Sequence, residues 1–179
     1  MKRFFTITAI LIAIVLMITI GLNAGTKHDF DKEAYNKIAK KAIGLVVSGN
    51  ADPEKMLVHL NTLVEMGIAG CQEHMNEPET PANEKKIMEW VIEQGPKMTS
   101  LSLDEIEKLW HDGGFLKGKG IDIDKFEHFD EVMCHYDAVV HPATAIICIN
   151  EYKKDKSEEH LDQIKDELAE VIEHIKHLE

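Results

Sequence analysis

A histidine lies in the middle of an almost entirely apolar stretch of this chain. Between Ala138 and Ile149 only His141 and Thr144 carry polar side chains. Asp137 precedes His141 by four residues, so on a helix the carboxylate and the imidazole lie one turn apart. A carboxylate in such a pair fixes the imidazole tautomer and leaves the other ring nitrogen free to bind a ligand or a metal. The sequence therefore predicts a candidate site around Asp137 and His141.

A second pair with metal-binding chemistry precedes it in the chain. Cys71 and His74 have the Cys-x2-His spacing that can direct two ligands at one ion. If this pair faces His141, one of the two remaining cysteines can complete a tetrahedral zinc or copper site. The predicted metal ligands are Cys71, His74, Cys134, His141 and Cys148. Cys134 and Cys148 are not expected to pair with each other, because one helix would hold them too far apart for a disulfide.

Haem is a variant of the metal hypothesis. A b-type haem between His141 and a second axial ligand from Met66, Met75 or His74 fits a helical protein. Covalent c-type haem is excluded because the sequence has no Cys-x-x-Cys-His motif. The simplest interpretation is different again: His141 is a core histidine, hydrogen-bonded to Asp137 and to a carbonyl that Pro142 leaves free.

The glycine-rich segment 111–124 adjoins two aromatic residues that could line an apolar ligand pocket, Trp110 and Phe115. It contains neither a GxxxxGK[ST] nor a GxGxxG motif, so a phosphate-binding loop is not expected. No GxSxG or papain-like cysteine motif is present either. A thiol in an apolar helix has a raised pKa and low reactivity, so the sequence favours a non-enzymatic protein.

Helices must position these residues, because helical periodicity and helix caps recur along the chain whereas strand-like alternation does not. Asp52 with Pro53, Thr80 with Pro81, and Ser102 with Glu105 are typical helix starts. The apolar stretch predicts a central helix over about 125–153, kinked near Pro142. We therefore predict an all-α fold, an antiparallel bundle of four to five helices.

Length and charge restrict the class of protein. A chain of 179 residues with 32 acidic and 20 basic side chains, and a net charge of −12, is expected to form one domain that repels phosphate backbones. Nucleic acid is therefore not an expected partner.

The N-terminus predicts export. Lys2 and Arg3 precede an apolar run, and Ala24 follows among small residues, so 1–24 reads as a signal peptide or an N-terminal membrane anchor. Residues 25–179 are then a single extracytoplasmic domain, periplasmic or secreted. Membrane contact is expected only through residues 6–22, if the signal is uncleaved.

These observations predict an exported, acidic helical-bundle protein that acts as a binding or accessory module. Its ligand would be a protein or small molecule outside the cytoplasm, bound near Asp137, His141, Trp110 and Phe115, with no cofactor. The alternative is a metal- or b-haem-binding bundle that uses His141 with Cys71 and His74, in electron transfer, metal handling or sensing.

Overall fold

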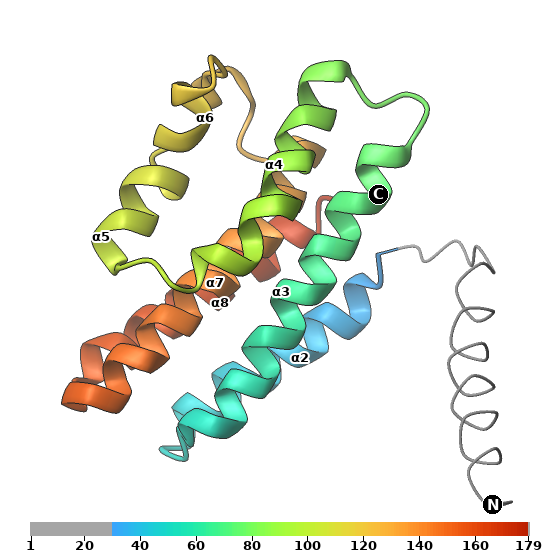
Figure 1. Ribbon diagram of the computed structural model, residues 1–179. Helices are drawn as coiled ribbons and strands as arrows, with labels where there is room; N and C mark the ends of the chain where they lie inside the picture. Colours follow the sequence, from blue (N-terminus) through green and yellow to red (C-terminus); the bar gives the residue numbers. More distant parts are fainter. Residues whose placement is uncertain (1–29, 179) are drawn as a thin grey trace, which may run out of the picture.

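The computed structural model describes residues 30–178, and this part of the chain is helical and contains no strand (Figure 1). The all-α prediction is therefore confirmed for the described residues. The predicted signal or anchor, 1–24, lies outside them. The elements in chain order are α2 (Lys32–Val47), α3 (Pro53–Asn76), α4 (Ala82–Met98), α5 (Leu103–Ile106), the π-helical turn η1 (Glu107–His111), α6 (Gly114–Gly118), the 3-10 turn η2 (Ile123–Lys125), α7 (Glu131–Asp155) and α8 (Glu158–Ile175).

Two of the predicted helix starts have the expected caps. The Asp52 carboxylate accepts hydrogen bonds from the backbone N–H groups of Glu54 and Lys55, at the start of α3. Ser102 and Glu105 form the reciprocal capping box that opens α5. Both caps satisfy backbone donors that the first turn of a helix leaves without intrahelical partners.

Helix α7 is the core of the described protein. Every residue from Val132 to Ile149 is buried, and α7 packs against α3, α4 and α8, while α2 packs against α3 and α8 (Figure 1). Among residues 30–178, only α7 is long and apolar enough to span a membrane, and the apolar part of it is entirely buried inside the protein. Such burial is what a core helix requires, because an element that is apolar on all sides must be surrounded.

Pro142 lies inside α7 and cannot donate a backbone hydrogen bond to the Ala138 carbonyl one turn earlier. The Tyr35 hydroxyl of α2 donates to that carbonyl instead, over 2.7 Å. Gly67 of α3 makes room for this contact, since a Cβ at Gly67 would lie only 2.3 Å from the Ala138 oxygen. The sequence had led us to expect a hydrogen bond from His141 to the freed carbonyl. The donor to this carbonyl is Tyr35 instead.

Helix α7 begins at Glu131 rather than near residue 125. Asp130 accepts a hydrogen bond from the Glu127 backbone N–H over 2.8 Å, which stabilises a turn immediately before the helix. Phe129 is 43% exposed and so does not extend the buried face of α7. As a result His128 belongs to a loop, from which it reaches α8.

Helix α4 continues through Gly95 and Pro96 and ends at Met98. Gly95 packs closely against Val139 of α7 and Ile68 of α3, where an added Cβ would lie 3.0 and 3.1 Å from their side chains. This packing holds the last turn of α4 in place. Met98, the last residue of α4, is also buried, and its burial further stabilises this turn.

Candidate functional site

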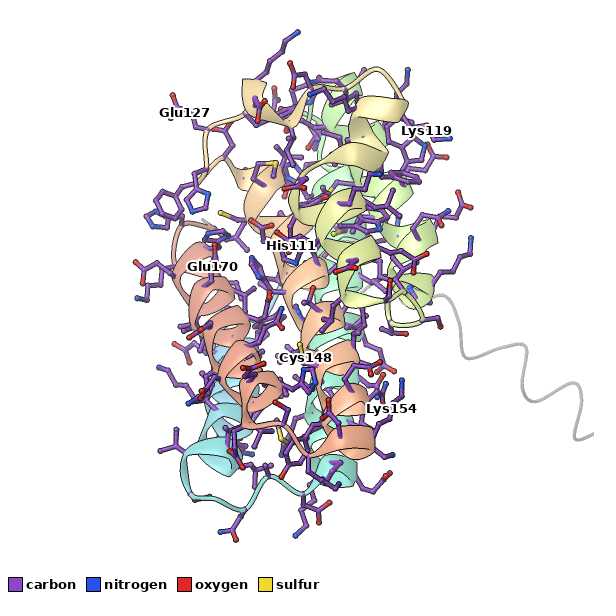
Figure 2. All side chains as sticks on the ribbon, turned by 90° about the vertical axis from the view of Figure 1, so that its left-hand side faces the viewer. His111, Lys119, Glu127, Cys148, Lys154 and Glu170 are labelled. Carbon is purple, nitrogen blue, oxygen red and sulfur yellow. The ribbon has the colours of Figure 1, made fainter. Side chains whose placement is uncertain are left out.

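A continuous line of histidines and carboxylates crosses the interface between α7 and α8. We call it the α7–α8 cluster, and its side chains lie close together although they come from α7, α8, η1 and the loop before α7. Its members are His111, His128, Asp137, His141, Glu167, Glu170 and His174. Figure 2 shows His111 and Glu170, at two ends of this line, at a similar height in the molecule.

Asp137 is paired mainly with His174, not with His141. The Asp137 carboxylate lies 2.6 Å from Nδ1 of His174, whereas its other oxygen is 3.9 Å from Nε2 of His141. The closest partner of His141 is Glu167 of α8, whose Oε2 lies 2.7 Å from Nδ1 of His141. The sequence predicted a contact between these two residues of α7, but the shortest contact of each is with a residue of α8.

These neighbours also shift the pKa of His141. Burial alone would lower the pKa of His141, but the hydrogen bond to Glu167 and the negative charges of Asp137, Glu167 and Glu170 together raise the pKa above its ordinary value. The same three carboxylates therefore favour the protonated form of His141 over the neutral form.

The π-helical turn η1 delivers His111 to the same interface. Nε2 of His111 lies 2.8 Å from the Thr144 hydroxyl and 3.8 Å from Glu167. Thr144 donates its own hydroxyl proton to the Val140 carbonyl over 3.1 Å, so His111 must be the donor to Thr144. A π-helical turn is rare and often occurs at functional sites.

Three overlapping groups of the α7–α8 cluster can hold a metal ion, because each offers three ligand atoms within 4.8 Å of one another. They are His111, His141 and Glu167; Asp137, His141 and His174; and His128, Glu170 and His174. We call the last group the outer site, since His128 and Glu170 are exposed and His174 is buried.

The outer site has the most complete ligand arrangement. Because the Nδ1–H of His174 donates to Asp137, the Nε2 lone pair of neutral His174 points outward. It faces Nε2 of His128 over 2.9 Å. Two imidazole nitrogens converge in this way either to share a proton or to hold a metal ion together.

Sequence reasoning missed most of these residues. Glu170 and His174 lie one turn apart on α8, and Glu170 is exposed whereas His174 is only 2% exposed. Its place beside Val171 and Ile175 on the apolar stripe was the available signal. His111, His128 and Glu167 carried no local signal of a shared site.

The predicted cysteine ligands lie elsewhere. Cys71 donates to the His135 carbonyl over 3.3 Å, and no cysteine belongs to any metal-binding group found among residues 30–178. His74 groups with Glu131 and His135, apart from His141. Figure 2 shows Cys148 toward the end of α7 that Lys154 marks, away from Glu170.

The three cysteines are free and buried. Burial, aided by nearby carboxylates, raises the pKa of Cys134 to about 11 and that of Cys148 to about 12. Burial raises the pKa of Cys71 further still. Thiolates are therefore strongly disfavoured at all three positions.

Trp110 and Phe115 stack on each other with ring centroids 4.7 Å apart. Trp110 is buried, and its backbone carbonyl accepts a hydrogen bond from the Tyr136 hydroxyl over 2.6 Å. The two aromatic residues thus pack together at the edge of the core. An apolar ligand pocket between them remains a prediction.

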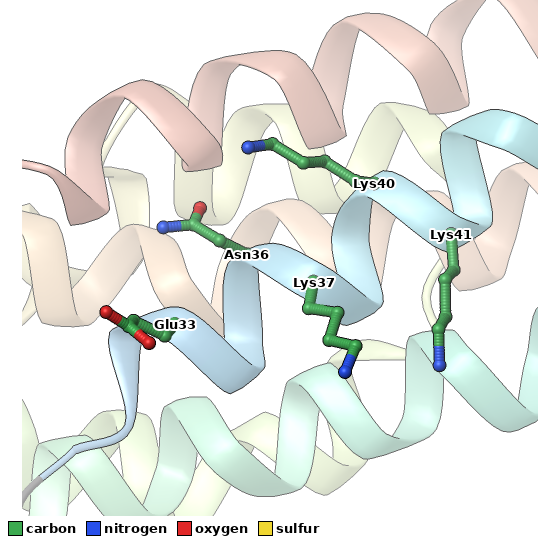
Figure 3. Close-up of a pocket in the computed structure, with 5 residues that line it drawn as sticks. All are labelled: Glu33, Asn36, Lys37, Lys40 and Lys41. Atoms are coloured by element: carbon green, nitrogen blue, oxygen red, sulfur yellow. The ribbon is translucent and has the colours of Figure 1, made fainter.

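An open pocket of about 550 Å³ lies on α2 (Figure 3). Three lysines and two other polar residues line it, and none of them is a predicted site residue: Glu33, Asn36, Lys37, Lys40 and Lys41. Solvated lysines on one helix do not by themselves make a binding site, because such side chains are mobile and well hydrated.

No protein-family model, curated protein or solved structure matches this chain. The chemistry of the α7–α8 cluster is therefore the basis on which a function is proposed below. Imidazole nitrogens and carboxylate oxygens bind divalent transition metals, and also exchange protons. The converging nitrogens at the outer site favour the first of these roles.

Proposed function

We propose that this protein is a non-enzymatic binding protein whose ligand is a divalent transition-metal ion, held at the outer site by His128, Glu170 and His174. One observation carries the proposal: His174, oriented by Asp137 over 2.6 Å, directs its free nitrogen at His128. A carboxylate that orients a histidine ligand in this way is a recurring feature of metal sites in proteins.

The donor set favours Zn²⁺ or Cu²⁺. Two imidazoles and one carboxylate suit these ions, and the set leaves a fourth position for water or for a ligand. The thiolates that would favour Cu⁺ are not part of this site. A b-type haem on His141 has less support, because His74, one of its predicted second axial ligands, groups with Glu131 and His135 rather than with His141.

Exposure and charge support uptake of a cation. His128 and Glu170 are exposed, so an ion can reach the outer site from solvent without opening the core. The net charge of −12 raises the local concentration of cations near the protein surface. The two further groups that contain His141 lie inward along the same cluster and would accept the ion less readily.

The proposal includes an architecture. We take α2, α3, α4, α7 and α8 to form an antiparallel bundle with α7 at its centre and a bend near Pro142. The packing of α7 against α3, α4 and α8 supports this arrangement. A bend at Pro142 would be favoured by the missing hydrogen bond to Ala138.

The proposal also includes a location outside the cytoplasm, either secreted or tethered by the N-terminus. Its support is the basic start and apolar run of residues 1–24. Fractionation of cells that produce the full chain, with mass spectrometry of the mature N-terminus, tests this part. Cytoplasmic protein with an intact N-terminus would overturn it.

Metal binding is tested by equilibrium dialysis of the purified, chelator-treated full chain against Zn²⁺. The wild type is expected to bind zinc, and His128→Ala and Glu170→Gln are each expected to lose the equivalent held at the outer site. Both replaced side chains are exposed, so neither change should disturb the core. His59→Ala on α3 is the matched control, because His59 belongs to none of the metal-binding groups, and it should bind zinc as the wild type does. Equal zinc binding by His128→Ala, Glu170→Gln and wild type would overturn the proposal.

A further inference from the structure

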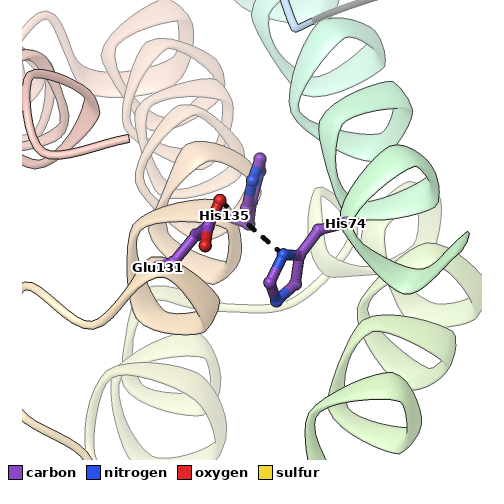
Figure 4. A group of neighbouring side chains, drawn as sticks. All are labelled: His74, Glu131 and His135. Carbon is purple, nitrogen blue, oxygen red and sulfur yellow. Dashed lines mark ion pairs between the residues drawn. The ribbon is translucent and has the colours of Figure 1, made fainter. Parts of the chain in front are cut away.

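A second group of histidines lies on the opposite side of α7, between α3 and α7. It consists of His74, Glu131 and His135, which we call the α3–α7 cluster (Figure 4). Their potential ligand atoms lie within 4.8 Å of one another, and the group shares no residue with the α7–α8 cluster. The two imidazole rings are stacked, with centroids 5.1 Å apart.

His74 carries an unsatisfied nitrogen inside the protein. It is only 3% exposed, and its Nε2 lies 3.3 Å from Glu84, to which it can donate. Neutral His74 then has a lone pair on Nδ1, and this atom is buried without a hydrogen-bond partner. Its nearest polar neighbours are carboxylate oxygens of Glu77, at 3.4 Å, and of Glu131, at 3.9 Å.

In neutral His74, the Nδ1 lone pair therefore faces carboxylate oxygens, which are also hydrogen-bond acceptors. A lone pair that faces two carboxylates is unfavourable unless a cation or a second proton on His74 lies between them. Glu84 has the role toward His74 that Asp137 has toward His174, since each carboxylate engages one ring nitrogen and so orients the other.

His135 supplies the second imidazole. It is 5% exposed, and its Nδ1 is also buried without a hydrogen-bond partner. A buried polar atom without a partner is costly, and two such atoms in adjacent rings are rare in a folded protein. Ring stacking with His74 and the edge of Phe30 holds His135 in place.

We infer that the α3–α7 cluster is a second binding site for a divalent transition-metal ion of the zinc and copper class, with His74 and His135 as nitrogen ligands and Glu131 as the oxygen ligand. The Glu131 and Glu77 side chains are 45% and 51% exposed, and they form the entrance through which an ion reaches the buried rings. The site does not depend on the outer site, because the two have no ligand in common.

The experiment counts zinc ions bound by the full chain, in the wild type and in variants of each site. The wild type is expected to bind two equivalents. Glu131→Gln should lose the equivalent of the α3–α7 cluster and retain the other, whereas His128→Ala should do the reverse. Glu131 is on the first, partly exposed turn of α7, so its replacement by the isosteric amide keeps the fold. His59→Ala again serves as the matched control.

A second measurement identifies the ligand atoms. In ¹H–¹⁵N spectra of the histidine side chains, zinc should shift the Nδ1 resonance of His74 and a ring nitrogen of His135 in wild type and in His128→Ala. These shifts should be absent in Glu131→Gln at the same zinc concentration. A His74 ring that is doubly protonated at neutral pH and unchanged by zinc would overturn the inference, because a proton would then be the cation in the site.

The two proposals fail in different ways. One equivalent, lost in His128→Ala and unaffected by Glu131→Gln, would overturn the α3–α7 site and leave the outer site standing. One equivalent that is lost in Glu131→Gln and unaffected by His128→Ala would overturn the outer site and leave the α3–α7 site standing. No bound zinc in the wild type would overturn both.

Discussion

At the scale of single residues, Asp137 orients a ligand of the proposed outer site although it is not itself one of the ligands. Its carboxylate lies 2.6 Å from Nδ1 of His174 and 3.9 Å from Nε2 of His141, so one side chain engages two imidazoles. The strong contact fixes the tautomer of His174 and the direction of its free nitrogen. Asp137 is therefore a positioning residue.

Replacing Asp137 by asparagine tests this role. Asp137→Asn keeps the size of the side chain but removes the carboxylate that accepts from Nδ1 of His174 and fixes its tautomer, and is expected to weaken zinc binding at the outer site by about 10- to 100-fold. Calorimetric titration with zinc measures the affinity, and urea unfolding of the metal-free protein measures stability separately.

A purely structural role would have a different signature. Asp137→Asn would then lower the stability of the metal-free protein and leave the affinity of the outer site unchanged. The zinc equivalent assigned to the α3–α7 cluster is the internal control, because His74 and Glu131 do not contact Asp137, and its affinity should not change.

At the scale of helices, Pro142 and Tyr35 act as a pair across the α2–α7 contact. Pro142 leaves the Ala138 carbonyl without its intrahelical partner, and the Tyr35 hydroxyl replaces that partner over 2.7 Å. A hydrogen bond of this kind matters most where the acceptor has no alternative in the core. A hydrogen bond from α2 thus replaces the one that Pro142 removes from α7.

This pairing predicts a coupling between two substitutions. Tyr35→Phe is expected to lower the free energy of unfolding by about 1–3 kcal/mol, because it leaves a buried carbonyl unsatisfied. In a Pro142→Ala background the same change should cost less, since residue 142 then donates to Ala138 within the helix. Urea unfolding of the wild type, both single variants and the double variant gives the coupling.

The matched control is Tyr136→Phe, which removes a hydroxyl that donates to the Trp110 carbonyl over 2.6 Å. That carbonyl does not depend on Pro142 for a partner, and it also accepts from the Gly113 backbone N–H over 3.1 Å. Tyr136→Phe should therefore cost the same with Pro142 or Ala at position 142. An equal cost of Tyr35→Phe in both backgrounds would contradict the pairing.

At the scale of the whole molecule, no thiol belongs to a group of residues 30–178 that could hold a metal ion, although Cys71 donates to the His135 carbonyl. The three cysteines are buried and free, and burial raises the pKa of each. A thiol enzyme requires the opposite, an accessible cysteine with a lowered pKa. The metal sites that we propose accordingly use imidazoles and carboxylates at the two interfaces of α7.

Alkylation kinetics test the burial of these thiols. Iodoacetamide at neutral pH is expected to leave Cys71, Cys134 and Cys148 of the native protein unmodified over a period in which all three react in urea. Intact-mass spectrometry counts the modified thiols, and the unfolded sample is the control for reagent and time. One cysteine that reacts as fast in the native as in the unfolded protein would indicate a reactive thiol and reopen the enzymatic interpretation.

The sequence by itself determined the helices, because the signals that make them lie within a few residues of one another. Asp52 and Ser102 cap their own helices, and the apolar run through His141 required a buried position whatever surrounds it. Even so, the start of α7 differed from expectation, since the hydrogen bond between Glu127 and Asp130 forms a turn where the local signals favoured a helix.

Only the tertiary structure decided which side chains meet. His141 and Glu167 are 26 residues apart, Asp137 and His174 are 37 apart, and His128 and His174 are 46 apart. The spacing of Asp137 and His141 on one helix was readable, but helix periodicity says nothing about the register of α8 against α7. That register depends on the summed packing of both apolar faces, so the groups that could hold a metal ion are visible only in the packed helices.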